Sequence, residues 1–186
     1  MTDDRTWLRH CLATLAYRAA KTVRDAPPGF GGLRLEEPTA MTPGRILAHM
    51  GDLMAWALSM SQGRQTWRNS APGEWDAEVE RFFAALGAFD AYLASSAPLH
   101  AEPERLFQGP IADALTHVGQ LATRRRLAGS PVRGENYYVA EIVTGRAGLE
   151  QAPPVREAAV VPASRSSMPA DSRPVERPSG SGGPRG

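Results

Sequence analysis

The clearest helix signal in the chain lies in residues 42–61, TPGRILAHMGDLMAWALSMS. Thr42 can cap the free N–H groups at a helix start, and Pro43 fits the first helical position without losing a hydrogen bond. Apolar side chains then recur every three or four residues, the period of one helix face, to about Gly63. This stripe consists of Ile46, His49, Met50, Leu53, Trp56, Ala57 and Met60. The pattern therefore places His49 within the apolar face rather than on the solvent-exposed one.

Three more stretches of the chain carry the helical period, and they span residues 5–24, 75–95 and 109–129. The last of them opens with Gly109 and Pro110 and stops at a glycine. Proline near a helix start and glycine just past its end is the usual order. Together with the stretch above, these segments predict an all-α protein folded as a four-helix bundle.

The chain after the fourth predicted helix falls into two parts. Residues 135–143 hold enough apolar side chains to pack back on the helices as a short helix, a strand or an ordered arm, and the sequence does not choose among these. From residue 151 onward Pro, Ser, Gly and Arg dominate without periodicity, a composition typical of disorder. We therefore predict one domain, residues 1–150, with a short C-terminal arm, followed by a disordered tail, residues 151–186.

Composition limits the classes of function. With 186 residues and 42% hydrophobic content the chain can bury one core. No stretch approaches the roughly 20 apolar residues of a membrane span, and the N-terminus is acidic where a signal peptide is basic, so a cytoplasmic protein without a membrane partner is expected. A net charge of +1 gives no general field for nucleic acid, which we do not expect as a partner. The single cysteine, Cys11, excludes a cysteine-rich metal site, so any metal must use His and carboxylates.

Three residues form a candidate metal site. Asp113 and His117 are four residues apart, which places their side chains on one helix face. His49 faces inward from another helix, and helical bundles build metal sites from such inward side chains. Two imidazoles and one carboxylate suit Zn, Ni, Fe or Mn and leave coordination positions open, as catalytic sites do. The alternative interpretation is structural, with hydrogen-bonded core histidines and a D-x-x-x-H pair that arises by chance.

A family resemblance favours the metal interpretation. The segments ILAHMGDLMAW, residues 46–56, and DALTHVGQLATRRRLAGSPVRG, residues 113–134, resemble the DinB-like (DinB/YfiT) superfamily of four-helix-bundle metalloproteins, and the likeness spans about residues 5–148. In that superfamily one ligand is a His of the second helix, and two more, four residues apart, come from the fourth, the second directly before x-Gly-Gln. His49 and His117-Val118-Gly119-Gln120 fit this pattern. Asp113 departs from it, because His is usual at that position.

The resemblance also implies an activity. Characterised members are thiol-dependent S-transferases or isomerases, which use mycothiol or bacillithiol with the sulfur on the metal. A divalent metal, a low-molecular-weight thiol and a small electrophilic substrate are therefore the expected cofactors and partner, and a homodimer is left open. One alternative is a non-catalytic, stress-associated helical-bundle binding module. Another is a site for iron and oxygen, which a set of two His and one carboxylate permits.

Three neighbours of the candidate ligands have a second possible role. Asp52 lies one turn after His49 and Gln120 lies close to His117, so either side chain could orient a ligand. Trp56 could line the pocket. Each also has an ordinary structural interpretation, since an Asp or Gln can hydrogen bond elsewhere and a Trp in a helix stripe is usually a core residue.

Overall fold

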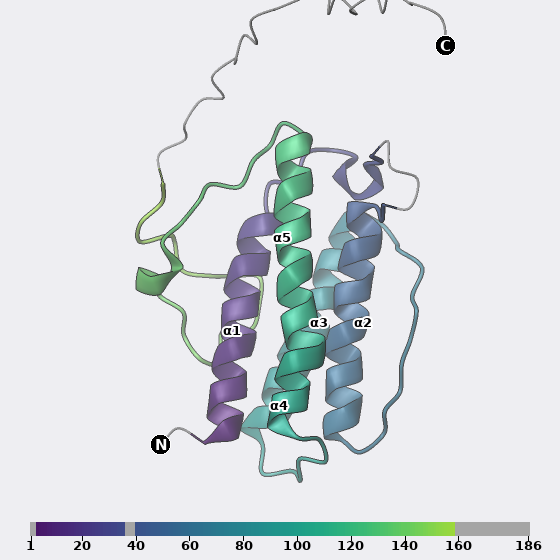
Figure 1. Ribbon diagram of the computed structural model, residues 1–186, viewed down its shortest axis with the longest axis vertical. Helices are drawn as coiled ribbons and strands as arrows, with labels where there is room; N and C mark the ends of the chain where they lie inside the picture. Colours follow the sequence, from purple (N-terminus) through teal and green to yellow (C-terminus); the bar gives the residue numbers. More distant parts are fainter. Residues whose placement is uncertain (1–2, 36–39, 159–186) are drawn as a thin grey trace, which may run out of the picture.

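The structure is a computed structural model that describes residues 3–35 and 40–158. Over these residues the regular secondary structure is helical, apart from an isolated antiparallel bridge between Glu135 and Glu157. The long helices that the structure describes lie side by side (Figure 1), and they are α1 (Asp4–Val23), α2 (Pro43–Ser61), α3 (Trp75–Ala94) and α5 (Ala112–Leu127). The shorter elements are 3-10 turns at Phe30–Gly32 and Tyr137–Val139, helix α4 (Pro103–Leu106) and a π-helical turn at Phe107–Ile111. The predicted all-α class is confirmed.

The start of α2 forms as its sequence predicts. The hydroxyl of Thr42 accepts a hydrogen bond from the backbone N–H of Arg45, and Pro43 occupies the first turn. Asp3 has the same role at α1, where its carboxylate accepts from the N–H groups of Arg5 and Thr6. In both cases a side-chain oxygen satisfies an N–H that has no partner within the helix. The starts of these two helices are therefore determined by local sequence.

The fourth long helix differs from the prediction at its start. Gly109 and Pro110 do not open it, because the chain is already helical from Pro103, and Pro110 lies inside the π-helical turn. Proline has no N–H to donate and its ring crowds the carbonyl of the preceding turn. A wider π turn accommodates such an interruption without ending the helix. As a result, an irregular turn directly precedes the part of α5 that carries Asp113.

The chain path makes α2 and α3 parallel. Residues 62–74 run along the length of the helices from the end of α2 to the start of α3 (Figure 1). The guanidinium of Arg5, at the start of α1, donates to the carbonyls of Tyr92 and Leu93 at the end of α3, so α1 runs opposite to α3. Helix α5 runs parallel to α1, and α2 is thus antiparallel to α5, which it contacts.

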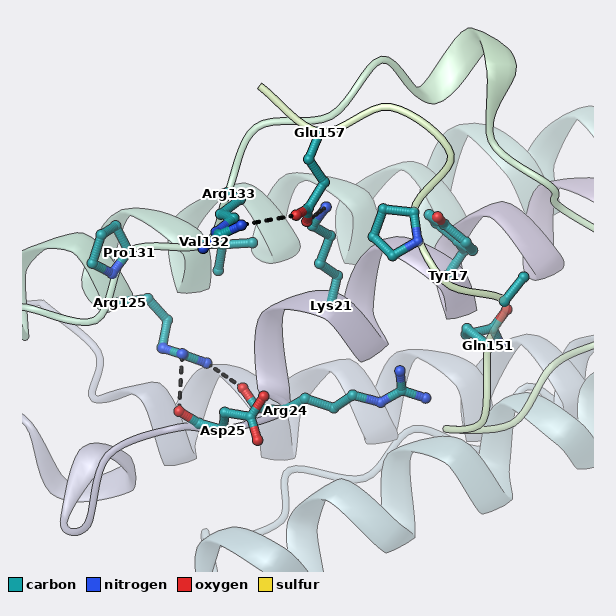
Figure 2. Close-up of a pocket in the computed structure, with 12 residues that line it drawn as sticks. Tyr17, Lys21, Arg24, Asp25, Arg125, Pro131, Val132, Arg133, Gln151 and Glu157 are labelled. Atoms are coloured by element: carbon teal, nitrogen blue, oxygen red, sulfur yellow. Dashed lines mark hydrogen bonds and ion pairs between the residues drawn. The ribbon is translucent and has the colours of Figure 1, made fainter. Parts of the chain in front are cut away.

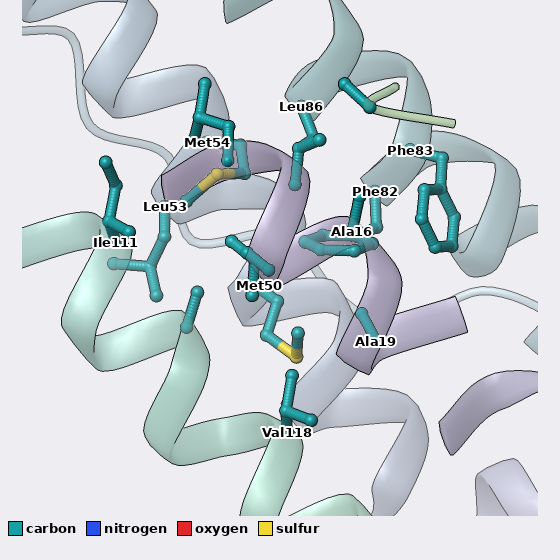
Figure 3. Close-up of a cluster of buried hydrophobic side chains, with 14 of the residues drawn as sticks. Ala16, Ala19, Met50, Leu53, Met54, Phe82, Phe83, Leu86, Ile111 and Val118 are labelled. Atoms are coloured by element: carbon teal, nitrogen blue, oxygen red, sulfur yellow. The ribbon is translucent and has the colours of Figure 1, made fainter. Parts of the chain in front are cut away.

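The core lies between the four long helices (Figure 3). Met50, Leu53 and Met54 of α2 meet Phe82 and other side chains from the remaining helices there, and all are buried. The remaining labelled members are Ala16, Ala19, Phe83, Leu86, Ile111 and Val118. None of the helices in the described ranges is long and apolar enough to cross a membrane. Because the core occupies one face of α2, the adjacent face, which includes His49, is turned toward α5.

A buried ion pair joins α2 to α3. The carboxylate of Asp52, only 2% exposed, accepts hydrogen bonds from the N–H and hydroxyl of Ser70 and from Arg81, all at 2.8 to 2.9 Å. Burial alone would raise the pKa of Asp52, but these hydrogen bonds and the charge of Arg81 outweigh it and lower the pKa below its usual value. Asp52 therefore stabilises the folded state as a carboxylate.

This pKa shift predicts how stability depends on pH. A carboxyl group whose pKa is lowered by folding adds stability above its unfolded pKa of about 4, and that contribution disappears as the pH falls through the lower folded pKa. We expect Asp52→Asn to lower the free energy of unfolding by about 1–3 kcal/mol at neutral pH. The difference should shrink in urea titrations as the pH falls below about 4. A difference that stays constant with pH would contradict this assignment.

Arg125 closes the opposite end of the helices. It is 5% exposed and donates to the carbonyl of Thr22, in the last turn of α1, and to those of Arg24 and Asp25, just past that turn. It also donates to the carbonyl and hydroxyl of Ser130, just past the end of α5. One guanidinium thus satisfies carbonyls that a helix end leaves without partners, and it joins the ends of α1 and α5.

The segment after α5 folds back on α1. Lys21, on α1, binds Glu135 and Glu157 at 2.7 Å each, and the hydroxyl of Tyr17 donates to Glu135. Beneath this segment lies a cavity of about 220 Å³ (Figure 2), whose basic groups are paired with carboxylates or carbonyls. The described chain thus extends past the predicted tail boundary at residue 151, and residues 159–186 of that tail lie outside the described residues.

Candidate metal centre

The structure brings the three predicted metal ligands together. Nε2 of His49 lies 3.5 Å from Oδ2 of Asp113, and Nε2 of His117 lies 3.4 Å from Oδ1 of the same carboxylate. One ligand atom from each residue lies within 4.8 Å of the other two. The two imidazole rings stand at 88° to each other, with centroids 4.9 Å apart. The three side chains thus surround a single point.

Helix packing explains how this group arises. Asp113 and His117 are one turn apart on α5, so their side chains share a face. α2 packs antiparallel against that face, which sets His49 opposite the pair. The side chain of His117 is 8% exposed, that of His49 28% and that of Asp113 46%. The group is therefore anchored on its buried side and open to solvent at the carboxylate.

The separations between each imidazole and the Asp113 carboxylate are longer than direct hydrogen bonds. Hydrogen bonds between an imidazole N–H and a carboxylate are typically 2.7 to 3.2 Å long. Two donor atoms bound to one tetrahedral ion at about 2.1 Å are about 3.4 Å apart. The observed 3.4 and 3.5 Å separations run to different oxygens of Asp113, and with one ligand atom taken from each residue the three atoms lie within 4.8 Å of one another. His49, Asp113 and His117 form a group that could hold a metal ion.

Gln120 orients one of the imidazoles. Its Oε1 lies 2.9 Å from Nδ1 of His117. In the tautomer whose Nδ1–H donates to this oxygen, the lone pair of Nε2 is directed toward Asp113. Metal-bound histidines usually donate their second N–H in this way. Gln120 therefore has the contact expected of a residue that positions a ligand.

Aromatic side chains form one wall of the centre. Trp67 packs edge-on against His49, with centroids 5.7 Å apart, and against Trp56 at 5.6 Å. Trp56 also lines a cavity of about 760 Å³ that reaches Gly109 and Pro110, in the turn before Asp113. Trp56 thus lies beside Trp67 and on a cavity whose described lining does not include the three ligands. The sequence does not predict a role for Trp67, because this residue lies in a polar connection without hydrophobic periodicity. No sequence pattern there indicates which way a side chain points.

Asp52 does not contact the centre. Its carboxylate binds Ser70 and Arg81 and has no described hydrogen bond to His49. Consecutive turns of α2 explain this, because His49 is turned toward α5 while Asp52 is turned toward α3. The role of orienting a histidine, considered for Asp52 from the sequence, is therefore replaced by a structural role between α2 and α3.

The fold and the site together define an all-helical protein with a two-histidine, one-carboxylate group. Comparison with known proteins adds no relative: no protein-family model matches the chain, and neither a curated protein nor a solved structure was found to match it. The DinB-like resemblance thus stays a prediction from the two motifs.

Proposed function

We propose that this protein is a DinB-like four-helix-bundle metalloprotein, with a divalent ion held by His49, Asp113 and His117. The observation that carries the proposal is that one ligand atom from each of the three residues lies within 4.8 Å of the other two. The side-by-side packing of the four long helices and the two motifs on α2 and α5 support the family assignment.

We further propose that the protein is a thiol-dependent S-transferase or isomerase for a small electrophilic substrate. A divalent ion at this site would lower the pKa of a bound thiol and so supply a nucleophile at neutral pH. The contact of Gln120 with Nδ1 of His117 favours the tautomer that ligates through Nε2, and the half-exposed Asp113 leaves room for a thiol. Trp56, which packs against Trp67, lines a cavity that can take an apolar electrophile.

The proposed transfer can be tested with mycothiol, bacillithiol and glutathione against chlorodinitrobenzene. In this reaction the thiolate sulfur bonds to the ring carbon, chloride leaves, and the thiol proton passes to solvent. We expect a rate that requires added divalent metal and that is lost in His117→Ala. The absence of a metal-dependent rate with every thiol, in protein shown to bind metal, would overturn the transferase proposal and leave the metal site intact.

The carboxylate position gives a separate prediction. We expect Asp113→His to retain or strengthen metal binding, because imidazole is also a competent ligand and a helix places it in the same direction. The measurement is a titration of the untagged protein with Zn²⁺ against a chelating indicator. Asp113→Ala is the matched control and should bind less tightly than the wild type. A folded Asp113→His protein that no longer binds metal would show that the third ligand lies elsewhere.

A further inference from the structure

Two adjacent arginines on α5 are buried in different ways. Arg125 is 5% exposed and its guanidinium is saturated with carbonyl and hydroxyl acceptors. Arg124 is 9% exposed, yet its Nη1 is fully buried without a hydrogen-bond partner. Among residues 3–35 and 40–158, no carboxylate forms an ion pair with Arg124 (the nearest ion pairs on α5 involve His117 and Asp113). Hydrogen bonds to neighbouring carbonyls therefore explain why Arg125 is buried, whereas no such contacts explain the burial of Arg124 among the described residues.

The burial of Arg124 is unfavourable in the absence of a ligand. Removing a guanidinium from water without supplying acceptors weakens the folded state, and natural cores pair such groups. Arginine is also the side chain best suited to carboxylates, because its parallel N–H groups match the two oxygens. A buried arginine with an unused donor is thus a candidate anion-binding group.

Arg124 lines a cavity of about 370 Å³. The other lining side chains include Leu35 and Met41, from the chain before α2, and Gln120 and Leu127, from α5. Among the described residues most of this lining is apolar, and the cation of Arg124 is the one charged group that they contribute. A cavity of this character favours a small molecule with an apolar body and an anionic end.

The cavity is linked to the proposed metal centre through Gln120. Arg124 follows His117 by two helical turns, a rise of about 10 Å, and helical side chains lean toward the helix start. Arg124 and Gln120, one helical turn apart on α5, line the same cavity. Gln120 lies between Arg124 and His117, since it contacts His117 and also lines the cavity. One small molecule could thus reach both Arg124 and the metal centre.

We propose that Arg124 binds the carboxylate of a small organic acid whose other end extends along Gln120 toward the metal centre. Binding at Arg124 is independent of the proposed function, whereas the link to the metal rests on it. The carboxylate can belong to the thiol or to the electrophilic substrate, and both sources present the same group to the guanidinium. Two experiments separate these sources.

The first experiment tests Arg124 alone, with hexanoate and its neutral match hexanamide as probes. Calorimetric titrations are made on the wild type, Arg124→Met and Arg126→Met, as purified and after EDTA treatment. We expect wild type to bind hexanoate at least about tenfold more tightly than hexanamide, as for a buried charge-assisted contact. Arg124→Met should lose this preference. Arg126→Met should keep it, because Arg126 is exposed on the same helix.

Two outcomes of this experiment would overturn the proposal. One is equal binding of both probes to the wild type, and the other is a hexanoate preference that persists in Arg124→Met. Misfolding can be recognised separately, because removing an unpaired buried charge should leave the melting temperature of Arg124→Met equal to or above that of the wild type. A lower melting temperature would require Arg124→Gln as the second variant, with the same expected loss of preference.

The second experiment tests the link to the metal, using ω-mercaptohexanoate and ω-mercaptohexanol with Co²⁺-loaded protein. The thiolate-to-cobalt absorption reports binding at the metal. A preference for the mercaptocarboxylate that disappears in Arg124→Met assigns the carboxylate to the thiol. Equal binding, with the hexanoate preference retained, assigns it to the second substrate. If Co²⁺ does not bind but the hexanoate preference remains, the metal proposal fails while the Arg124 site stands.

Discussion

His117→Ala is expected to abolish stoichiometric metal binding. Changes to a residue that merely orients a ligand typically cost about 10- to 100-fold in affinity, so the loss of a ligand should cost about 100-fold or more. His117 is the most buried of the three ligands, and water can replace its imidazole only with a weaker contact to an ion. The measurement is metal content per chain by elemental analysis, after dialysis of protein prepared without a histidine tag.

The matched control for this prediction is His10→Ala. His10 is exposed on α1 and contacts Thr144, away from the three ligands. This variant should retain the full metal content, which separates the effect of the site from that of losing any histidine. Equal metal content in the wild type and His117→Ala would refute the metal centre. Binding lost in both variants would indicate a general effect on folding, which circular dichroism can detect.

The second large effect is expected for stability. Arg125→Met should lower the free energy of unfolding by about 2–4 kcal/mol, because it leaves several carbonyls at the ends of α1 and α5 without donors. Lysine should not restore the loss, since one ammonium group cannot span acceptors arranged for a planar guanidinium. Urea denaturation monitored by tryptophan fluorescence gives the change in free energy.

The neighbouring residue provides the comparison for Arg125. Arg126 is exposed, and Arg126→Met should change the free energy of unfolding by less than about 0.5 kcal/mol. Similar destabilisation by both substitutions would mean that loss of charge, rather than loss of the carbonyl contacts, determines the result. Together the two variants isolate the hydrogen bonds that hold the ends of α1 and α5.

The sequence predicts those features of the fold that depend on local rules. Thr42 and Pro43 mark a helix start through capping chemistry that needs no distant partner, and the structure confirms it. Pro110 shows where such a rule fails, because a π turn lets a helix continue through proline. The packing of the flanking segments, which a local pattern does not contain, determines which outcome occurs.

The candidate site was predictable to a similar extent. His49 and His117 follow from helix faces and motif, and the structure brings them within reach of Asp113. Two features could not be inferred from the sequence. Trp67 depends on the path of a connection without periodicity, and the buried, unpaired state of Arg124 depends on what surrounds it in three dimensions. Hydrophobic periodicity identifies the face of a helix but not the partners of its polar groups.

In the proposed centre the metal ligands and the wall beside them come from different parts of the chain, because the wall residue Trp67 lies in the long connection between α2 and α3. The ligands stand on helices, whereas Trp67 belongs to residues 62–74, which Ser70 fixes to Asp52. Substitutions in this connection can reshape the wall beside His49 without changing any ligand. Variants of this chain with changes in residues 62–74 can therefore differ in which small molecules they bind at the site and still bind the ion with the same affinity.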